Sequence, residues 1–364
     1  MENYIAVKPY LDLDIFALQR MKAWQREVNL GAADPDANRF LDATFASVQS
    51  LLMREALFFD QIHMVQLETR NASLADQIAQ LTAESGGILS LVDPYALPPD
   101  TEPFGPPSEA VKNAFMAMIA EIPSVEKKGE NYDRRMKKLG KFKRSPKPHE
   151  SEGVPDGVWQ VIQENEALLG GFEKALIEDI YPSHSLAARM YTLVLEVRPH
   201  STPTPLLPFD SYLRKLPSSK RQDVAQLVVR NLPLPENNTP WEKIIDYRQD
   251  SDNRKDLVAL RRWIRKLSTE DLSPAECAEE LEWLQNEYQT HMRLHKIKSD
   301  TGALEVIVKA PLELLENLVT LKFSKMVDPL FAIKKRQISL MEAELSAPGR
   351  EIAYLVKAKE AIEK

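Results

Sequence analysis

Two stretches of the sequence decide which fold is expected: ALFFDQIHMV, residues 56–65, and ILSLV, residues 88–92. Both are short runs of aromatic and branched apolar residues, which are typical of strands, with a helix as the alternative for so short a run. The segment between them opens at Ser73 and closes at Gly86 and Gly87, as a helix does. It predicts a strand–helix–strand unit, the smallest part of a parallel sheet, with a right-handed crossover.

Helical patterns on both sides of this unit predict an α+β protein that is predominantly helical, with a small sheet of three to five short strands embedded in a multi-helix body. Helices are expected where apolar residues recur at spacings of three and four, which are residues 11–28, 35–54, 108–122, 158–181, 184–197 and 273–298. Further short strands are expected at residues 3–7, 226–230 and 301–308. The prolines of residues 200–208 predict a connector.

The sharpest local signals lie in NTPWEKIIDYRQDSDNRKDLVALRRWIRKL, residues 238–267. Thr239 and Glu242 have the spacing of a capping box, with a proline at the first helical position. The indole of Trp241 is expected on the buried side, and Arg248 near the negative end of the same helix. Structural roles are therefore predicted for Thr239, Trp241, Glu242 and Arg248.

A second helix follows in this stretch, with Asp250 as its expected cap. One side is apolar, with Leu257, Leu260, Ile264 and Leu267 at spacings of three and four. The other side is basic, and it is either a solvated face paired with nearby acids or a surface for an anion or a partner. Anion or partner binding is predicted for Arg254, Arg261, Arg262, Arg265 and Lys266.

A basic segment divides the chain. Residues 123–157 contain few large apolar residues, and Lys127 to Pro148 alone hold 10 basic and 2 acidic residues. Such a composition predicts a mobile linker, with an arm that grips phosphates as the alternative. It separates an N-terminal helical region, residues 1–122, which contains the strand–helix–strand unit, from a mainly helical C-terminal domain, residues 158–364, centred on 238–267.

The runs LFFDQIH and GGILSLVDP, and the run TPWEKIIDYRQD ahead of a basic helix, resemble uncharacterised bacterial proteins. The resemblance spans most of the chain outside residues 94–157. It implies a bacterial, cytoplasmic protein with a small sheet in a helical body. It brings no activity, cofactor or catalytic residue with it.

Composition and motifs narrow the possible functions. The 364 residues carry a net charge of 47 − 54 = −7 and include one cysteine, Cys277. These values argue against a global attraction to nucleic acid and against a disulfide framework. The first residues lack the pattern of a secretory signal, and no window has the roughly 18 apolar residues of a membrane span. A cytoplasmic protein without membrane contact is expected. Nucleotide-binding fingerprints are absent, so no cofactor is expected.

The strongest metal-ligand pattern is Glu287, His291 and His295, which share one helix face. Both histidines also continue an apolar seam that starts at Cys277, so a packing role is favoured and no metal is predicted. Acids with a neighbouring base, as a metal-dependent nuclease needs, occur at residues 196–198 and at 300–305. Asp60, a polar residue in an apolar run, is expected to cap a neighbouring helix rather than to form a site.

The sequence therefore predicts a helical protein-interaction or accessory component of a bacterial multi-protein system, with a protein as its partner. Binding of nucleic acid or another polyanion through residues 127–147 and 254–266 is the alternative. An enzyme of the nuclease type with an unrecognised site is the third possibility, and no catalytic residue is assigned.

Overall fold

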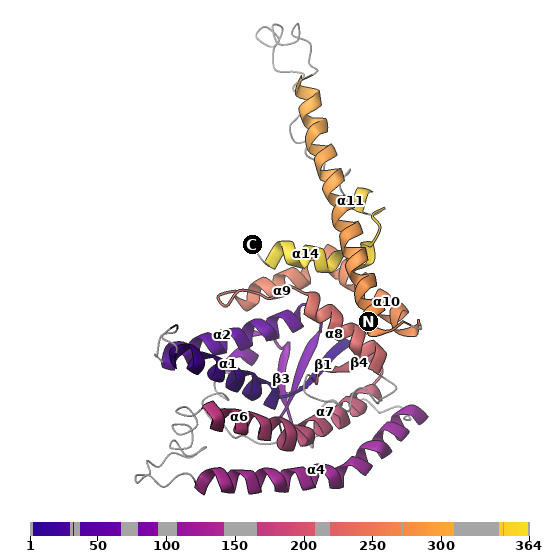
Figure 1. Ribbon diagram of the computed structural model, residues 1–364. Coiled ribbons are helices and arrows are strands. Elements are labelled where there is room, and N and C mark those ends of the chain that lie inside the picture. The colour runs from indigo at the N-terminus through magenta and orange to yellow at the C-terminus, as the bar shows by residue number, and fades with distance from the viewer. Residues whose placement is uncertain are drawn as a thin grey trace. The chain divides into compact units, whose positions relative to one another are not determined.

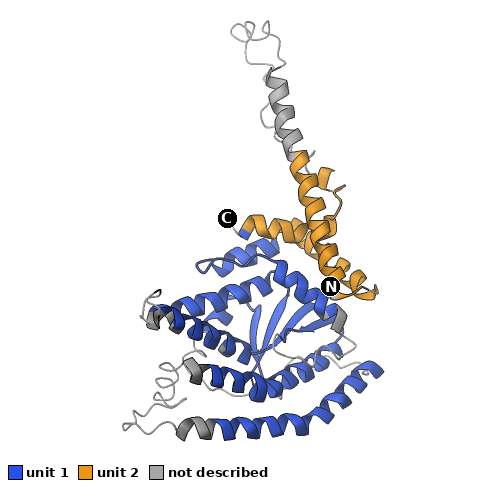
Figure 2. Cartoon of the chain, in the orientation of Figure 1, with its two compact units in different colours: residues 1–249, 362–364 blue, residues 250–361 orange. Residues whose placement is uncertain are grey.

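The protein is described from a computed structural model, which covers residues 3–29, 32, 37–66, 79–93, 108–141, 166–207, 219–270, 272–308, 342–344 and 346–362. The chain divides into two compact units, residues 1–249 with 362–364 and residues 250–361 (Figure 2). The division falls next to Asp250 and not in the basic segment 123–157. Within the described residues, no helix combines the length and the apolar character that crossing a membrane requires.

The first unit is built around a parallel sheet of four strands, β1 (Asn3–Pro9), β2 (Gln61–Val65), β3 (Leu89–Val92) and β4 (Ser201–Pro205). Their order is β3-β2-β1-β4, and every neighbouring pair is parallel. The predicted strand–helix–strand unit is thus confirmed, although its first strand begins at Gln61. The predicted class, a predominantly helical α+β protein with a small sheet, is confirmed as well.

Strand β4 lies where the prolines predicted a connector. It pairs with β1 so that Pro203 lies opposite Ile5 and Pro205 opposite Val7. Proline has no backbone N–H to donate, and strands that contain it are therefore confined to the edge of a sheet. The order of the strands places β4 at such an edge, which is why two prolines are tolerated there.

Helices cover both faces of this sheet. Those of the first unit are α1 (Leu11–Asn29), α2 (Ala37–Ala56), α4 (Glu109–Lys141), α6 (Glu166–Ala175), the π-helical segment η1 (Leu176–Ile180), α7 (Tyr181–Glu196), α8 (Ser219–Asn231) and α9 (Trp241–Gln249). Figure 1 shows α2 and α8 on one side of the sheet, α7 on the other side, and α4 packed outside α7.

The connections make the sheet doubly wound. The chain passes from β1 through α1 and α2 to β2, and from β3 through α4 and α7 to β4 on the opposite face. The direction of winding therefore reverses between the neighbouring strands β1 and β4. In sheets of this kind the crevice at such a reversal, outside the carboxyl ends of the strands, is where ligands bind.

Two expected strands are helices in the structure, so these predictions are wrong. Residues 226–230 belong to α8, and residues 301–308 form the last turns of α11 (Pro274–Val308). Branched residues favour strands, but their cost in a helix is below about 1 kcal/mol per residue. Burial of Val228 and Val229 in α8 outweighs that preference.

The expected end of a helix at Ile122 is also wrong, because α4 continues through Pro123 to Lys141. Arg189 of α7 holds this helix through a two-pronged ion pair with Glu121, at 2.6 and 3.2 Å. Further along α4, Arg135 pairs with Asp179 at 3.2 Å. Residues 123–141 are therefore part of a packed helix and not a linker, whereas residues 142–157 lie outside the described residues.

The second unit contains α10 (Ser251–Thr269), α11, the short 3-10 segment η3 (Arg350–Ile352) and α14 (Ala353–Ile362). Asp250 caps α10 as predicted, because its Oδ1 accepts from the amides of Asp252 and Asn253, both at 3.0 Å. Lys357 of α14 joins Asp256 of α10 at 2.7 Å and also pairs with Glu344. The predicted apolar stripe of α10 is buried.

Ser273 and Glu276 form a reciprocal capping box at the start of α11. The amide of Ser273 donates to Glu276 Oε2 at 2.6 Å, and the amide of Glu276 donates to Ser273 Oγ at 3.3 Å. We expect Ser273→Ala to lower the stability of this unit by about 0.5–2 kcal/mol, because a helix-end amide loses its acceptor. Urea denaturation would measure the loss. Ser273→Asp keeps an acceptor and serves as the control, so equal losses in both variants would contradict the prediction.

Candidate functional site

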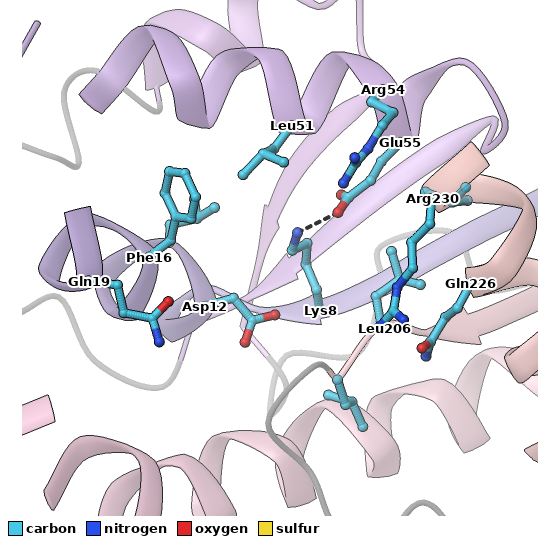
Figure 3. Close-up of a pocket in the computed structure, with 13 residues that line it drawn as sticks. Lys8, Asp12, Phe16, Gln19, Leu51, Arg54, Glu55, Leu206, Gln226 and Arg230 are labelled. Atoms are coloured by element: carbon cyan, nitrogen blue, oxygen red, sulfur yellow. Dashed lines mark hydrogen bonds and ion pairs between the residues drawn. The ribbon is translucent and has the colours of Figure 1, made fainter. Parts of the chain in front are cut away.

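A pocket of about 240 Å³ opens in the first unit at the carboxyl ends of β1 and β4, where the winding of the sheet reverses (Figure 3). Its apolar wall consists of Leu13, Phe16, Leu51, Leu206, Leu207 and Val229. Its polar side chains are Lys8, Asp12, Gln19, Arg54, Glu55, Gln226 and Arg230. They come from β1, α1, α2 and α8, so the pocket exists only when these elements pack together.

Lys8 enters the pocket because side chains alternate along β1. Ile5 and Val7 face α7 in the core, so the next residue, Lys8, points to the opposite face of the sheet. There its Nζ donates to Glu55 Oε1 at 2.7 Å, and both residues are buried. Glu55 lies in the last turn of α2, and its other oxygen, Oε2, has no hydrogen-bond partner among the described residues.

Asp12 is a buried acid in the first turn of α1, with 6% of its surface exposed. Burial raises its pKa most strongly, and the charge of Glu55 adds to that rise. The charge of Lys8 and the hydroxyl of Tyr181 lower the pKa in part, which leaves it at about 7. Neither carboxyl oxygen makes a hydrogen bond of normal geometry to any described residue. The group is therefore poised to gain or lose a proton near neutral pH.

Two arginines complete the polar part of the pocket. Burial lowers the pKa of the Arg54 guanidinium, Glu55 raises it, and the charge of Arg230 lowers it. The Arg54 guanidinium still carries its charge, because arginine is not deprotonated in proteins. Neither arginine makes a hydrogen bond or an ion pair with another described residue. With Lys8, the pocket holds three cations against two acids, Asp12 and Glu55, and one acid is already paired.

The predicted basic face of α10 needs one correction. Arg261 is only 7% exposed, because it lies about 40° around the helix from Leu257 and so at the margin of the buried stripe. Exposed side chains on the other side are Arg254, Arg262, Arg265 and Lys266. Two lysines of this helix pair with its own acids, Lys255 with Asp252 at 2.8 Å and Lys266 with Glu270 at 3.7 Å.

The predicted capping box of Thr239 and Glu242 is wrong in its second half, whereas Thr239 and Trp241 are buried as a structural role requires. Trp241 is 2% exposed, Thr239 is buried and Glu242 is exposed. The Thr239 amide, which a capping box would give to Glu242, donates to the carbonyl of Glu236 at 2.9 Å. Trp241 and Thr239 thus belong to the core of the first unit.

Asp60 and Arg248 form an ion pair at 2.9 Å, which ties the start of β2 to the last turn of α9. The second oxygen of Asp60 accepts from the amide of Tyr4 in β1 at 2.9 Å. Asp60, which was expected to cap a helix, therefore joins two strands and a helix. Arg248, which was predicted to interact with the negative end of its own helix, thus also forms an ion pair with this carboxylate.

The histidine pattern forms a packing contact. His291 Nε2 lies 3.1 Å from the carbonyl oxygen of Ala343, and its ring lies 4.5 Å from that of His295. Glu287 is exposed, and Cys277 is buried on the same seam. In the part of the chain that the structure describes, no three His, Cys, Asp or Glu side chains are grouped as metal ligands.

Glu196, one of the acids considered for a nuclease, is not among the described residues that line the pocket. Glu196 lies at the end of α7, where burial raises its pKa and Arg221 lowers it. The charge of Arg198 lowers the pKa of His63, which burial has already depressed, to about 4. Asp300 and Glu305 fall in the last turns of α11, where side chains are not described.

Sequence reasoning missed all five charged residues of the pocket: Lys8, Asp12, Arg54, Glu55 and Arg230. Lys8 could have been recognised from the sequence as a candidate, since a charged residue in an apolar strand needs a partner when it is buried. The partner was not predictable from spacing, because 47 residues separate Lys8 from Glu55.

Comparisons with known proteins give no information on function. No protein-family model matches this chain, no curated protein matches it, and no solved structure matches it. Any functional conclusion must therefore come from the chemistry of the site itself.

Proposed function

We propose that the first unit binds a small organic anion in the pocket between α1, α2 and α8. The observation that carries the proposal is the pair Arg54 and Arg230, two guanidinium groups in one pocket that form no ion pair or hydrogen bond with a described residue, although the charge of Glu55 acts on Arg54. Like charges held together cost free energy, which an anion between them would recover. A guanidinium offers a planar fork of donors that matches carboxylate and phosphate groups.

Two further features support this function. The pocket lies at the reversal point of a doubly wound parallel sheet, where the carboxyl ends of two strands leave a crevice for a ligand. Its apolar wall, with Phe16, Leu51 and Leu206, suits the carbon part of the ligand. A volume of about 240 Å³ favours a small molecule that carries one phosphate or carboxylate group.

The test is a variant that lacks both guanidinium groups, Arg54→Gln with Arg230→Gln. We expect sulfate, inorganic phosphate and glycerol 3-phosphate to raise the melting temperature of the wild-type protein, because a ligand of the folded state stabilises it. The variant should bind each anion at least about 10–100-fold more weakly, since a hydrogen bond to a charged group contributes about 1.5–3 kcal/mol. Thermal shift and calorimetry measure both effects.

The matched control is Arg254→Gln with Arg262→Gln, which removes two exposed arginines from α10. This control should bind the anions as the wild type does. Equal binding by the pocket variant and the wild type would overturn the proposed function, as would the absence of any binding by the wild type.

A second candidate is the accessory role, in which an acidic protein partner binds α10. The observation in its favour is an exposed stripe formed by Arg254, Val258, Arg262 and Arg265. These residues lie within about 80° of one another around the helix. Arg262→Glu with Arg265→Glu should release a partner that co-purifies from the native host. If nucleic acid is the ligand instead, the wild type should show salt-dependent binding that this variant weakens.

A further inference from the structure

The carboxyl group of Asp12 is the least satisfied polar group of the pocket. Its residue is 6% exposed, and both carboxyl oxygens are buried without a hydrogen-bond partner among the described residues. Nearly all buried polar groups in folded proteins have a partner. Besides the nearby hydroxyl of Tyr181, the group has only the pocket before it, since Figure 3 shows Asp12 facing the pocket interior opposite Lys8.

Charged groups approach Asp12 from several elements. Lys8 of β1, Glu55 of α2 and the hydroxyl of Tyr181 in α7 act on it directly, whereas Arg54 of α2 and Arg230 of α8 line the same pocket. Lys8 is engaged at 2.7 Å by Glu55, so it cannot serve Asp12 as a full counterion. Burial then dominates and raises the pKa of Asp12 to about 7.

An anion bound in this pocket would raise the pKa of Asp12 further. It would neutralise the two arginines and would place a further negative charge in the cavity that contains Asp12. Like charges within one site raise the pKa of a carboxyl group. The protonated carboxyl also becomes a hydrogen-bond donor, whereas an ionised phosphate, sulfate or carboxylate can only accept.

We propose that the pocket binds its anion together with one proton, which Asp12 takes from solvent and donates in a hydrogen bond to an oxygen of the ligand. This inference rests on the proposed anion site and narrows its ligand class. The preferred ligands are fully ionised oxyanions that face Asp12 with an acceptor. A molecule that presents an ammonium group there would instead favour the ionised acid and would release a proton.

Sulfate is the appropriate probe, because it stays doubly charged throughout the neutral range. Titration calorimetry near pH 8, in buffers that differ in ionisation enthalpy, measures the protons exchanged. We expect the wild type to take up close to one proton per sulfate. Its affinity should fall by up to about tenfold per pH unit above neutrality, because the proton must be supplied from an increasingly dilute pool.

The variant Asp12→Asn distinguishes the effect of protonation from the effect of side-chain shape. The carboxamide keeps a donor without titrating, so this variant should bind sulfate without proton uptake and with an affinity that is independent of pH. Asp12→Ala removes the donor and should bind more weakly at every pH. The thermal unfolding of each variant shows whether it is folded.

The outcomes distinguish this inference from the function on which it rests. Sulfate binding that depends on Arg54 and Arg230 but shows no proton uptake, or shows proton release, overturns the inference and leaves the anion site standing. Sulfate binding that is unaffected by Arg54→Gln with Arg230→Gln, or no sulfate binding at all, overturns both.

Discussion

Lys8→Met is expected to lower the free energy of unfolding of the first unit by about 3–5 kcal/mol. The ammonium group of Lys8 and the carboxylate of Glu55 are 2.7 Å apart, and both residues are buried. Removal of one partner leaves the other charge in a medium of low polarity without compensation. Methionine keeps most of the volume of lysine, so the loss reports charge rather than packing. Urea denaturation, with hydrogen exchange of sheet peptides to identify the unit, measures it.

The control is a double variant, in which Glu55→Gln is added to Lys8→Met. It removes the stranded carboxylate, so the double variant should recover most of the lost stability, because exchange of a whole buried ion pair for neutral groups of similar size is often close to neutral. A double variant as unstable as Lys8→Met would show that packing, and not the ion pair, is responsible. The same result would remove Lys8 from the electrostatic account of the pocket.

Asp12→Asn is expected to stabilise the protein, by up to about 4 kcal/mol near pH 8. Burial raises the pKa of Asp12 from 3.8 to about 7 in the folded protein. Between these two values the unfolded chain releases a proton that the folded chain retains, so the folded state loses stability as the pH rises. The loss is about 1.4 kcal/mol per pH unit and stops increasing above pH 7.

The pH dependence identifies the cause of this effect. The stability gained by Asp12→Asn should grow from near zero at about pH 4 to its plateau above neutral pH, in urea titrations at several pH values. Asp42→Asn in α2 is the control, because this aspartate is exposed and a change there should leave the curve unaltered. A gain that is equal at all pH values would indicate better packing and not the burial of a charge.

The second prediction makes Asp12 a group of the pocket at which stability is given up, whereas Lys8 and Glu55 neutralise each other. A carboxyl group that costs free energy above neutral pH, in a pocket with two arginines that form no ion pair with a described residue, is unfavourable unless a ligand is present. Groups with strongly shifted pKa values in a pocket are candidates for binding or catalysis. The pocket therefore stands apart from the Lys357 ion pairs of the second unit, in which each charge has a partner.

The sequence by itself determined the features that depend on neighbouring residues. The cap by Asp250, the capping box of Ser273 with Glu276 and the buried stripe of α10 are local, because a helix end or a helix face is formed by residues within a few positions of one another. The strands of residues 61–92 follow in the same way from short apolar runs with a helical segment between them.

Tertiary structure alone decided the rest. Strand β4 exists because β1 offers it a parallel edge, and residues 226–230 are helical because Val228 and Val229 are buried on the sheet. The pocket combines Lys8, Asp12, Glu55 and Arg230, which are far apart along the chain. Local propensities amount to less than about 1 kcal/mol per residue, whereas burial and the pairing of charges across the fold contribute several, so these distant contacts determined both the last strand and the site.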